Sequence, residues 1–245
     1  MTVLSVNLNK IALLRNSRGH DYPNVLHMAE RSLKLGAGGV TVHPRPDARH
    51  ATYEDVRRLR TWIKTFPDCE LNVEGYPSES FLDLIEETAP HQCTLVPDAD
   101  NQLTSDHGWD LPKEIELLKP MVSKIKEAGV RVSIFIDANP KIASLAKETG
   151  TDRVELYTGP YAEDFSTAKA EVTMASYQKT AQTAFEAGLG INAGHDLDLN
   201  NLAPLLKRIP KIEEVSIGHA LTVEALDLGW DETIRRYLEI TNASK

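Results

Sequence analysis

The chain has 245 residues, of which 41% are hydrophobic and 26% are charged, the ordinary balance of a soluble globular protein. Its net charge of −9 argues against a general nucleic-acid-binding surface, so any site for anions has to be local. The sequence has neither an apolar run of the length of a membrane span, about 18 residues, nor the regions of a signal peptide. Cys69 and Cys93 fit no metal-ligand spacing, and we expect a reduced, cytoplasmic protein without nucleic-acid or membrane partners.

Eight strand-and-helix pairs follow one another along the chain. Runs rich in β-branched and apolar residues predict strands at 4–9, 39–43, 70–74, 92–96, 131–137, 153–157, 190–193 and 214–217. Apolar residues at helical spacing predict helices at 23–35, 52–66, 81–88, 113–128, 141–149, 168–187, 199–208 and 222–241. Strands separated by helices pair in parallel, and this number of units in about 250 residues favours a closed (β/α)₈ barrel. We expect one domain over residues 1–245.

An open, doubly wound sheet is the competing architecture. No G-x-G-x-x-G sequence follows the first predicted strand, which argues against a dinucleotide-binding fold.

The stretch 39–50, GVTVHPRPDARH, joins the end of a buried strand to a cluster of cations. Pro44 and Pro46 do not suit a central strand, so His43 stands where the strand stops. Arg45, Arg49 and His50 follow directly. A titratable group at a strand end, followed by cations, is what a site for phosphorylated substrates needs.

Polar residues end most of the other predicted strands as well. They are Asn7, Asn9, Glu74, Asp137, Glu155, His195 and His219. The carboxyl ends of the strands form one rim in a parallel barrel, where catalytic groups lie, and histidines with carboxylates suit repeated proton transfer. Each residue also has a structural interpretation: a lone histidine is more often hydrogen-bonded scaffold than catalyst, and Asp137 could cap the next helix. Several such residues on one rim favour a site; His27, His91 and His107 are interpreted as structural or surface residues.

Glycine-containing turns after the last two predicted strands suggest a place for phosphate. Gly194-His195 and Gly218-His219 lie where backbone N–H groups and a helix N-terminus can bind an anion, although such glycines can also serve the turn alone. A second phosphate could be held by Arg18, Arg45 and His50. His43, Glu74 and His195 lack metal-ligand spacing, so we expect no metal.

Several segments, in this order, resemble the pyridoxine 5′-phosphate synthase family: VNLNKIALLRNSRG, GVTVHPRPDARH, LVPD, SIFIDA, VELYTGPYA, INAGHDL and SIGHA. The resemblance covers nearly the whole chain and implies a (β/α)₈ barrel that assembles as a homo-octamer. It also implies condensation of 1-deoxy-D-xylulose 5-phosphate with 3-amino-2-oxopropyl phosphate into pyridoxine 5′-phosphate, phosphate and water. No metal or organic cofactor takes part in the family's reaction.

The resemblance also implies roles for individual residues. His43 matches the first proton acceptor, Glu74 the second, His195 the proton donor, and Glu155 the residue that stabilises the transition state. Glu74 is chosen over Glu70 because Asn72-Val73-Glu74 matches the family's Asn-apolar-Glu pattern. Positions that match the amino-ketone phosphate site are Asn7, Arg18, Asp196, Gly218 and His219. Positions that match the sugar phosphate site are Asn9, Lys10, Arg45, His50 and Thr104.

Two departures from the family pattern affect these roles. Asn9-Lys10 stands where the family commonly has Asp-His, and Lys10 could supply the charge of that histidine. Asp196 stands where glycine is frequent, a neutral change if phosphate is bound there through the backbone. We further expect burial or neighbouring negative charge to raise the pKa of Glu74, and the loop 98–110 to act as a lid.

Two other functions are compatible with parts of the pattern. A different phosphate-binding barrel lyase or isomerase, such as an aldolase, would need a Schiff-base lysine, and Lys10 is the nearest candidate. A binding module that only senses a phosphorylated metabolite would need no clustered acid–base groups.

Overall fold

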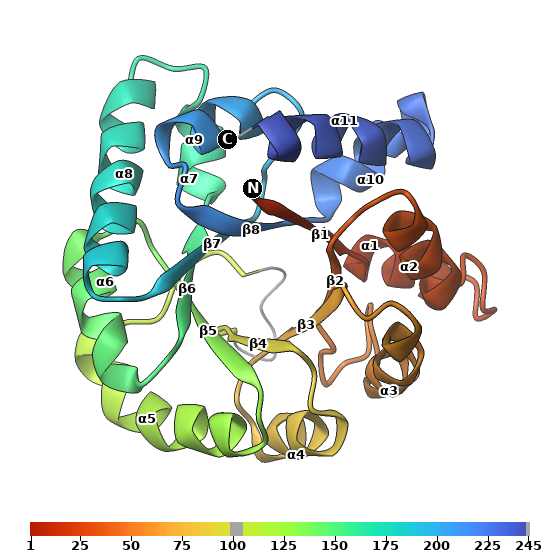
Figure 1. The fold of residues 1–245 in the computed structure, drawn as a ribbon. Coiled ribbons are helices and arrows are strands. Elements are labelled where there is room, and N and C mark those ends of the chain that lie inside the picture. Colours follow the sequence, from red (N-terminus) through yellow and green to blue (C-terminus); the bar gives the residue numbers. More distant parts are fainter. Residues whose placement is uncertain (99–104, 244–245) are drawn as a thin grey trace.

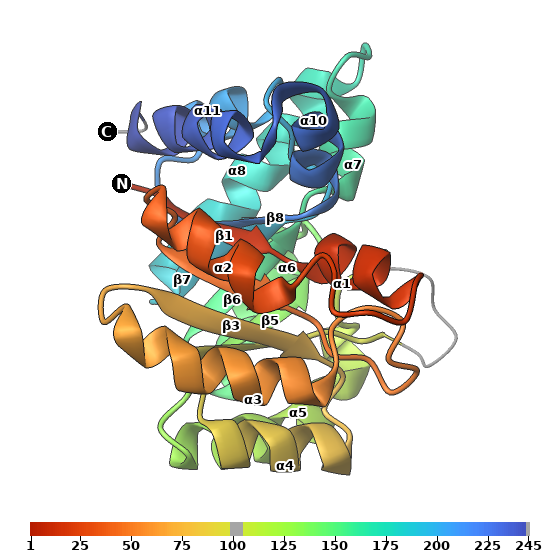
Figure 2. The same ribbon diagram turned by 90° about the vertical axis from the view of Figure 1, so that its right-hand side faces the viewer.

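The computed structural model describes residues 1–98 and 105–243 and shows a closed barrel of eight parallel strands surrounded by helices (Figures 1 and 2). The strands are β1 (Val3–Asn7), β2 (Gly39–Val42), β3 (Glu70–Gly75), β4 (Gln92–Leu95), β5 (Arg131–Ile136), β6 (Arg153–Tyr157), β7 (Gly190–Gly194) and β8 (Ile212–Ile217). They pair in chain order, and β1 closes the barrel by pairing with β8. The predicted (β/α)₈ barrel is therefore confirmed, and the open sheet is wrong.

The helices cover the outside of the barrel (Figure 1). They are α1 (Asn9–Asn16), α2 (Val25–Lys34), α3 (Tyr53–Trp62), α4 (Glu79–Thr88), α5 (Leu111–Glu127), α6 (Pro140–Ala146), α7 (Gly159–Asp164), α8 (Ala170–Glu186), α9 (Leu202–Arg208), α10 (His219–Leu228) and α11 (Trp230–Ala243). Short 3₁₀ turns, η1 (Ile63–Thr65) and η2 (Lys147–Thr149), extend α3 and α6. Within the described residues, no helix combines the length and the apolarity needed to cross a lipid bilayer.

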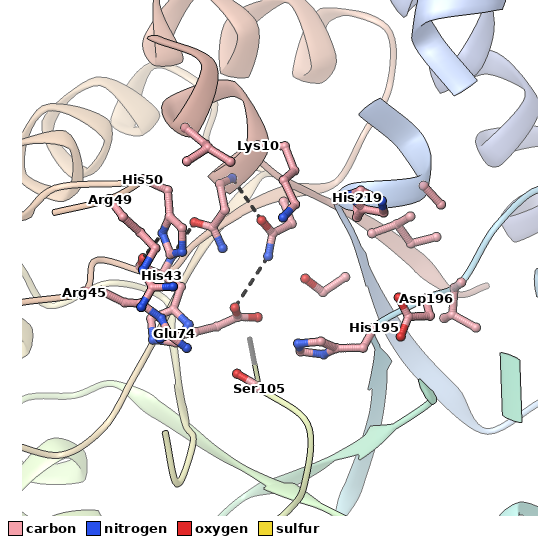
Figure 3. A pocket seen from close by; sticks show the side chains of 18 residues that line it. Lys10, His43, Arg45, Arg49, His50, Glu74, Ser105, His195, Asp196 and His219 are labelled. Carbon is pink, nitrogen blue, oxygen red and sulfur yellow. Dashed lines mark hydrogen bonds between the residues drawn. The ribbon is translucent and has the colours of Figure 1, made fainter. Parts of the chain in front are cut away.

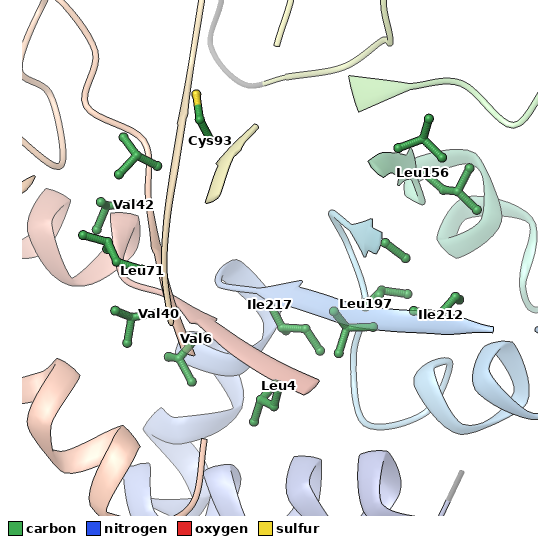
Figure 4. Packing of buried hydrophobic residues seen from close by; sticks show 14 of the residues in the cluster. Leu4, Val6, Val40, Val42, Leu71, Cys93, Leu156, Leu197, Ile212 and Ile217 are labelled. Carbon is green, nitrogen blue, oxygen red and sulfur yellow. The ribbon is translucent and has the colours of Figure 1, made fainter. Parts of the chain in front are cut away.

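Alternation along the strands separates an apolar outer face from a polar barrel interior. Leu4 and Val6 of β1 belong to the buried apolar cluster shown in Figure 4, together with Val40 and Val42 of β2. Since successive side chains of a strand point to opposite faces, the residues between them face the barrel axis. The interior residues bond to one another: Ser5 Oγ lies 2.7 Å from Thr41 Oγ1, and the chain of bonds continues through Asn72 and Thr94.

The structure differs from the sequence-based expectation after β1. The first strand ends at Asn7, whose side-chain oxygen accepts a 3.0 Å hydrogen bond from the backbone N–H of Asn9. This local turn stops the strand, as asparagine side chains often do. Asn9 therefore opens helix α1, and the prediction of a strand that continues to residue 9 is wrong.

Two further helices were not expected. Helix α7 occupies part of the predicted loop 158–167. The predicted helix 222–241 is in fact two helices, α10 and α11, because Gly229 has a φ of +81°, which ends α10. The division lets α10 begin earlier, at His219, directly after β8. The N-terminus of α10 is thereby placed at the rim of the barrel.

A buried ion pair fixes α1 against the rest of the barrel. Arg15 donates to both carboxylate oxygens of Asp55 at 2.5 and 2.8 Å, and Asp55 also forms the capping box of α3 with Thr52. Helix α1 carries Asn9 and Lys10, so this pair holds two of the predicted binding residues in place.

Candidate active site

A cavity of about 430 Å³ opens at the carboxyl ends of the strands (Figure 3). Most residues predicted from the sequence line it: Asn7, Asn9, Lys10, His43, Arg45, His50, Glu74, His195, Asp196, Gly218 and His219. They come from units far apart in the chain and meet because the strands of a parallel barrel end at one rim. The cavity is of a size that suits small organic substrates.

Other predicted features do not line the cavity or are not described by the structure. Arg18 is exposed just after α1 and does not line the cavity. Glu155 is 1% exposed inside the barrel. Thr104 lies outside the described residues, as do residues 99–103 of the loop 98–110, so the lid stays a prediction. Asp137 does not cap the following helix: Asn139 caps α6, and Asp137 accepts a bond from the backbone of Gly108 instead.

His43 is held at the end of β2 as a neutral base. Its backbone N–H donates to the side-chain oxygen of Asn9 at 2.8 Å, and its carbonyl oxygen lies 2.9 Å from Nδ1 of His50. The His43 side chain is 5% exposed, and burial, followed by the Arg45 charge, lowers its pKa well below the ordinary value. At neutral pH the imidazole is uncharged, so it can accept a proton. Asn9 thus positions His43, and this role does not depend on whether Asn9 also binds substrate.

Glu74 ends β3 and points into the cavity from the side opposite His195 (Figure 3). Burial raises its pKa from the ordinary value of 4.5 to about 8. The negative charges of Asp98 and Glu214 raise this pKa further, and the positive charge of Arg45 lowers it. The side-chain amide of Asn7 donates to Oε2 of Glu74 at 3.5 Å. The expected rise in this pKa is confirmed, and the carboxyl group can exchange protons near neutral pH.

Two more acids are buried in the barrel interior. Burial and the Glu74 charge raise the pKa of Glu155 well above its ordinary value. Glu214 of β8 accepts a 3.2 Å bond from Gln92, and burial raises its pKa to about 7. Gly194 of β7 makes room for Glu155, since a Cβ at that position would collide with the Glu155 carboxyl. At neutral pH the Glu155 carboxyl group therefore stays protonated, and that of Glu214 is close to its titration midpoint.

His195 follows β7 in a strained turn. Its φ is +78°, and Asp196 has a φ of +55°, both in the left-handed region. The imidazole packs against Phe135 with ring centroids 4.9 Å apart. Burial lowers its pKa, while the charges of Asp196 and Asp98 act in the opposite direction. In the unliganded protein the ring is thus mostly neutral at pH 7 and has to gain a proton before it can donate one.

Positive groups and backbone donors surround the cavity on several sides. Gly218, His219 and Ala220 line it at the start of α10, where N–H groups are free of intrahelical partners. Lys10 and Arg49 line it as well. The arrangement can hold two anionic groups, one at the N-terminus of α10 and one near the loop after β2.

Sequence reasoning missed three residues that line the cavity, contact the groups that line it, or act on those groups through their charge. Asp98 follows β4 and forms a buried ion pair with Arg45. Because the LVPD segment ends a predicted strand, Asp98 could have been found by the same argument that places functional residues at the carboxyl ends of barrel strands. Ser105 lines the cavity and donates to Asp98 at 2.7 Å. Glu214 gave no signal, because the sequence does not distinguish it from its exposed neighbour Glu213. Among the described residues, no group of three or more His, Cys, Asp or Glu side chains could hold a metal ion.

Comparison with known sequences identifies a family. The family model described as pyridoxal phosphate biosynthesis protein PdxJ matches residues 4–243. A relative named pyridoxine 5′-phosphate synthase from Mesorhizobium japonicum is 52% identical over 237 residues, covering 96% of each chain. Another of that name, from Christiangramia forsetii, is 50% identical over 240 residues, covering 98% of this chain and 99% of the relative.

Solved structures support the fold at much lower sequence identity. KGPDC from Streptococcus mutans has a TM-score of 0.65 and 14% identity, covering 99% of this chain and 98% of its own. Phosphoribosylanthranilate isomerase from Thermotoga maritima has a TM-score of 0.61 and 15% identity, covering 99% of this chain and 100% of its own. At this level of identity the likeness extends to the barrel architecture alone.

Proposed function

The chain belongs to the family of the pyridoxal phosphate biosynthesis protein PdxJ, and from this membership we propose how its cavity works as a pyridoxine 5′-phosphate synthase site. The protein is an enzyme of vitamin B6 biosynthesis. It condenses 1-deoxy-D-xylulose 5-phosphate with 3-amino-2-oxopropyl phosphate, and it releases pyridoxine 5′-phosphate, phosphate and water. The observation that carries the proposal is the meeting of His43, Glu74 and His195 around one cation-rimmed cavity.

The two phosphates of the substrates occupy opposite ends of the cavity. The phosphate of the amino ketone binds the N–H groups of Gly218 and His219 at the start of α10, where the helix dipole adds to the attraction. The phosphate of the sugar binds near Arg45 and His50, with Lys10 supplying positive charge. When both substrates are anchored in this way, the amine of one lies close to the carbonyl group of the other. The condensation then becomes an effectively unimolecular reaction within the cavity.

Proton transfers at the cavity centre then drive condensation and ring closure. Forming a Schiff base between the two substrates requires a proton to leave the amine and another to reach the carbonyl oxygen. His43, neutral at rest, accepts the first proton, and Glu74 accepts a later one when it is ionised. His195 returns a proton to the leaving oxygen after it has itself been protonated. Burial raises the pKa of Glu74 to about 8, so its carboxyl group can exchange a proton near neutral pH, and burial lowers the pKa of His43, which keeps that imidazole uncharged there.

The test follows product formation and proton-transfer variants together. Purified protein is mixed with both phosphates, and the absorbance of the pyridine ring and the release of inorganic phosphate are measured. We expect His43→Asn and Glu74→Gln to lower kcat by about 10²–10⁴. His27→Asn on exposed α2 and Glu239→Gln on exposed α11 are the matched controls, and both should leave the rate unchanged. Wild-type rates in the His43 and Glu74 variants would contradict the proposal.

The aldolase alternative predicts a different outcome for Lys10. Borohydride reduction in the presence of substrate would then attach substrate covalently to the Lys10 side chain. In our proposal the Schiff base forms between the two substrates, so reduction leaves the protein unlabelled. Mass spectrometry of the treated protein distinguishes the two reactions. Tight binding of both phosphates with no turnover would favour a metabolite sensor.

We also propose that the chain assembles as a homo-octamer in the cytoplasm. Exposed apolar side chains on α1 and α10 support burial against other copies: Leu13, Leu14, Val223 and Leu226 are 42–80% exposed. The unpaired thiols of Cys69 and Cys93 fit a reducing compartment. Sedimentation equilibrium tests the assembly, and fractionation of cells tests the compartment.

A further inference from the structure

The geometry points to Asp98 as a positioning residue of the synthase, one that holds Arg45 against the cavity wall and places a negative charge beside Glu74 and His195. The inference rests on the proposed function for the roles of Glu74 and Arg45. Asp98 lies just beyond β4, is not among the residues expected to bind substrate or transfer protons, and is 6% exposed.

The first support is the contact between Asp98 and Arg45. Nη2 of Arg45 donates to Oδ2 of Asp98, and the two side chains are only 6% and 4% exposed. The hydroxyl of Ser105 donates to the same carboxylate oxygen at 2.7 Å. A guanidinium presents its N–H groups in a rigid fork, so fixing one edge also fixes the direction of the others. Asp98 thus sets the orientation in which Arg45 meets a phosphate.

The second support is that the negative charge of Asp98 acts on both Glu74 and His195. The titratable and polar groups that interact with Glu74 come from several strands and loops: Asp98, Glu214, Glu155, Arg45, Asn7 and Ser216. The thiol of Cys93, whose pKa the Glu74 charge raises, belongs to the apolar cluster on the outer face of the strands. After burial, the charge of Asp98 contributes most to raising the pKa of Glu74, and Arg45 opposes it. Asp98 also raises the pKa of His195. One carboxylate therefore makes both proton-transfer groups more basic.

A purely stabilising role explains the pair less well. Desolvation of two charges usually offsets much of their attraction, so a buried ion pair is a poor way to stabilise a fold. A second buried arginine–aspartate pair in the described part of the chain, Arg15–Asp55, has a clear structural role, since Asp55 completes the capping box of α3. Asp98 caps none of the described helices and lies against the cavity instead, since its partners Arg45 and Ser105 both line it.

The test measures the titration of the Glu74 carboxyl directly, by NMR of protein labelled with ¹³C at glutamate side-chain carboxyls, with Glu74→Gln identifying the signal. Asp98→Asn removes a negative neighbour and leaves Arg45 to act on Glu74, so the midpoint falls by about one pH unit. Arg45→Gln leaves Asp98 uncompensated, so the midpoint rises. The double variant returns close to the wild-type midpoint. Asp98→Glu retains the negative charge, so its Glu74 midpoint should lie close to that of the wild type.

Asp55→Asn is the matched control, because it breaks a buried arginine–aspartate pair away from the cavity. It should leave the Glu74 midpoint unchanged. Shifts of the same sign in Asp98→Asn and Arg45→Gln, or a shift as large in Asp55→Asn, would overturn the inference. The NMR titration does not require turnover, so it separates this inference from the proposed function. An inactive wild-type protein would refute the function while the titration still tests Asp98, and an active one with unshifted midpoints would refute only the inference.

In active protein the kinetics supply a second readout. The acidic limb of the pH profile of kcat/KM reports the essential base of the free enzyme. We expect that limb to move to lower pH in Asp98→Asn and to higher pH in Arg45→Gln, in step with the NMR midpoints. A limb that stays fixed while the midpoints move would show that Glu74 is not the base being observed.

Discussion

Replacing Glu74 by glutamine should make the protein more stable in alkaline solution even as it removes activity. The folded-state pKa of Glu74 is raised from 4.5 to about 8, so the folded protein binds this proton more tightly than the unfolded chain does. The resulting stabilisation is fully present below pH 4.5 and is lost as the pH rises through 8. Each unit of difference between the folded and unfolded pKa is worth about 1.4 kcal/mol, so the raised pKa of Glu74 contributes about 5 kcal/mol to the free energy of unfolding at low pH. About 3 kcal/mol of this contribution is lost between pH 6 and 9.

The assay is urea unfolding of wild type and Glu74→Gln at pH 6 and pH 9. We expect wild type to lose about 3 kcal/mol more free energy of unfolding across this interval than the variant does, because glutamine has no proton to lose. Glu239→Gln on exposed α11 is the control and should follow wild type. Parallel curves for wild type and Glu74→Gln would refute the reasoning, since they would mean that burial does not oppose ionisation of this carboxyl.

Three other variants test separate parts of the site. Asp55→Ala leaves the Arg15 charge buried without its partner, and we expect urea unfolding to show a loss of about 3–5 kcal/mol. Burial and Arg45 lower the pKa of His50 to about 4, so His50→Gln should keep the shape of the pH profile while raising the KM for the sugar phosphate about three- to tenfold. A Cβ at Gly218 would lie 2.9 Å from that of Asn7, so Gly218→Ala should raise the KM for the amino-ketone phosphate, measured at saturating sugar phosphate.

The residues at the rim of the barrel were predictable because the order of strands and helices along the chain is enough to place them there. Once strands and helices alternate, topology places every strand end on one edge, so His43, Glu74 and His195 could be brought together without knowing any distance. The strands themselves were visible because short apolar runs were bounded by glycine and proline, as at Pro44 and Pro97.

The predictions that failed concern the end of β1 and the interior acid Glu214, and both depend on side-chain contacts that the sequence pattern does not show. The end of β1 is set by the Asn7 side chain bonding to the backbone two residues later, and the same sequence reads equally well as two more strand residues. Adjacent Glu213 and Glu214 look alike in the sequence. Only the closed barrel turns Glu213 outward to Arg153 and buries Glu214 beside Gln92.

The three interior acids share burial as the leading cause of their raised pKa values and differ in the cations that oppose it. Glu214 has Arg153 within 3.8 Å and reaches about 7; Glu74 has Arg45 and reaches about 8. For Glu155 no cation is among the causes, and the negative charges of Glu74 and Glu214 raise its pKa further. At neutral pH Glu155 is therefore a neutral acid with a hydrogen to donate. If it stabilises the transition state, it does so as a hydrogen-bond donor to developing negative charge rather than as an anion beside a positive one.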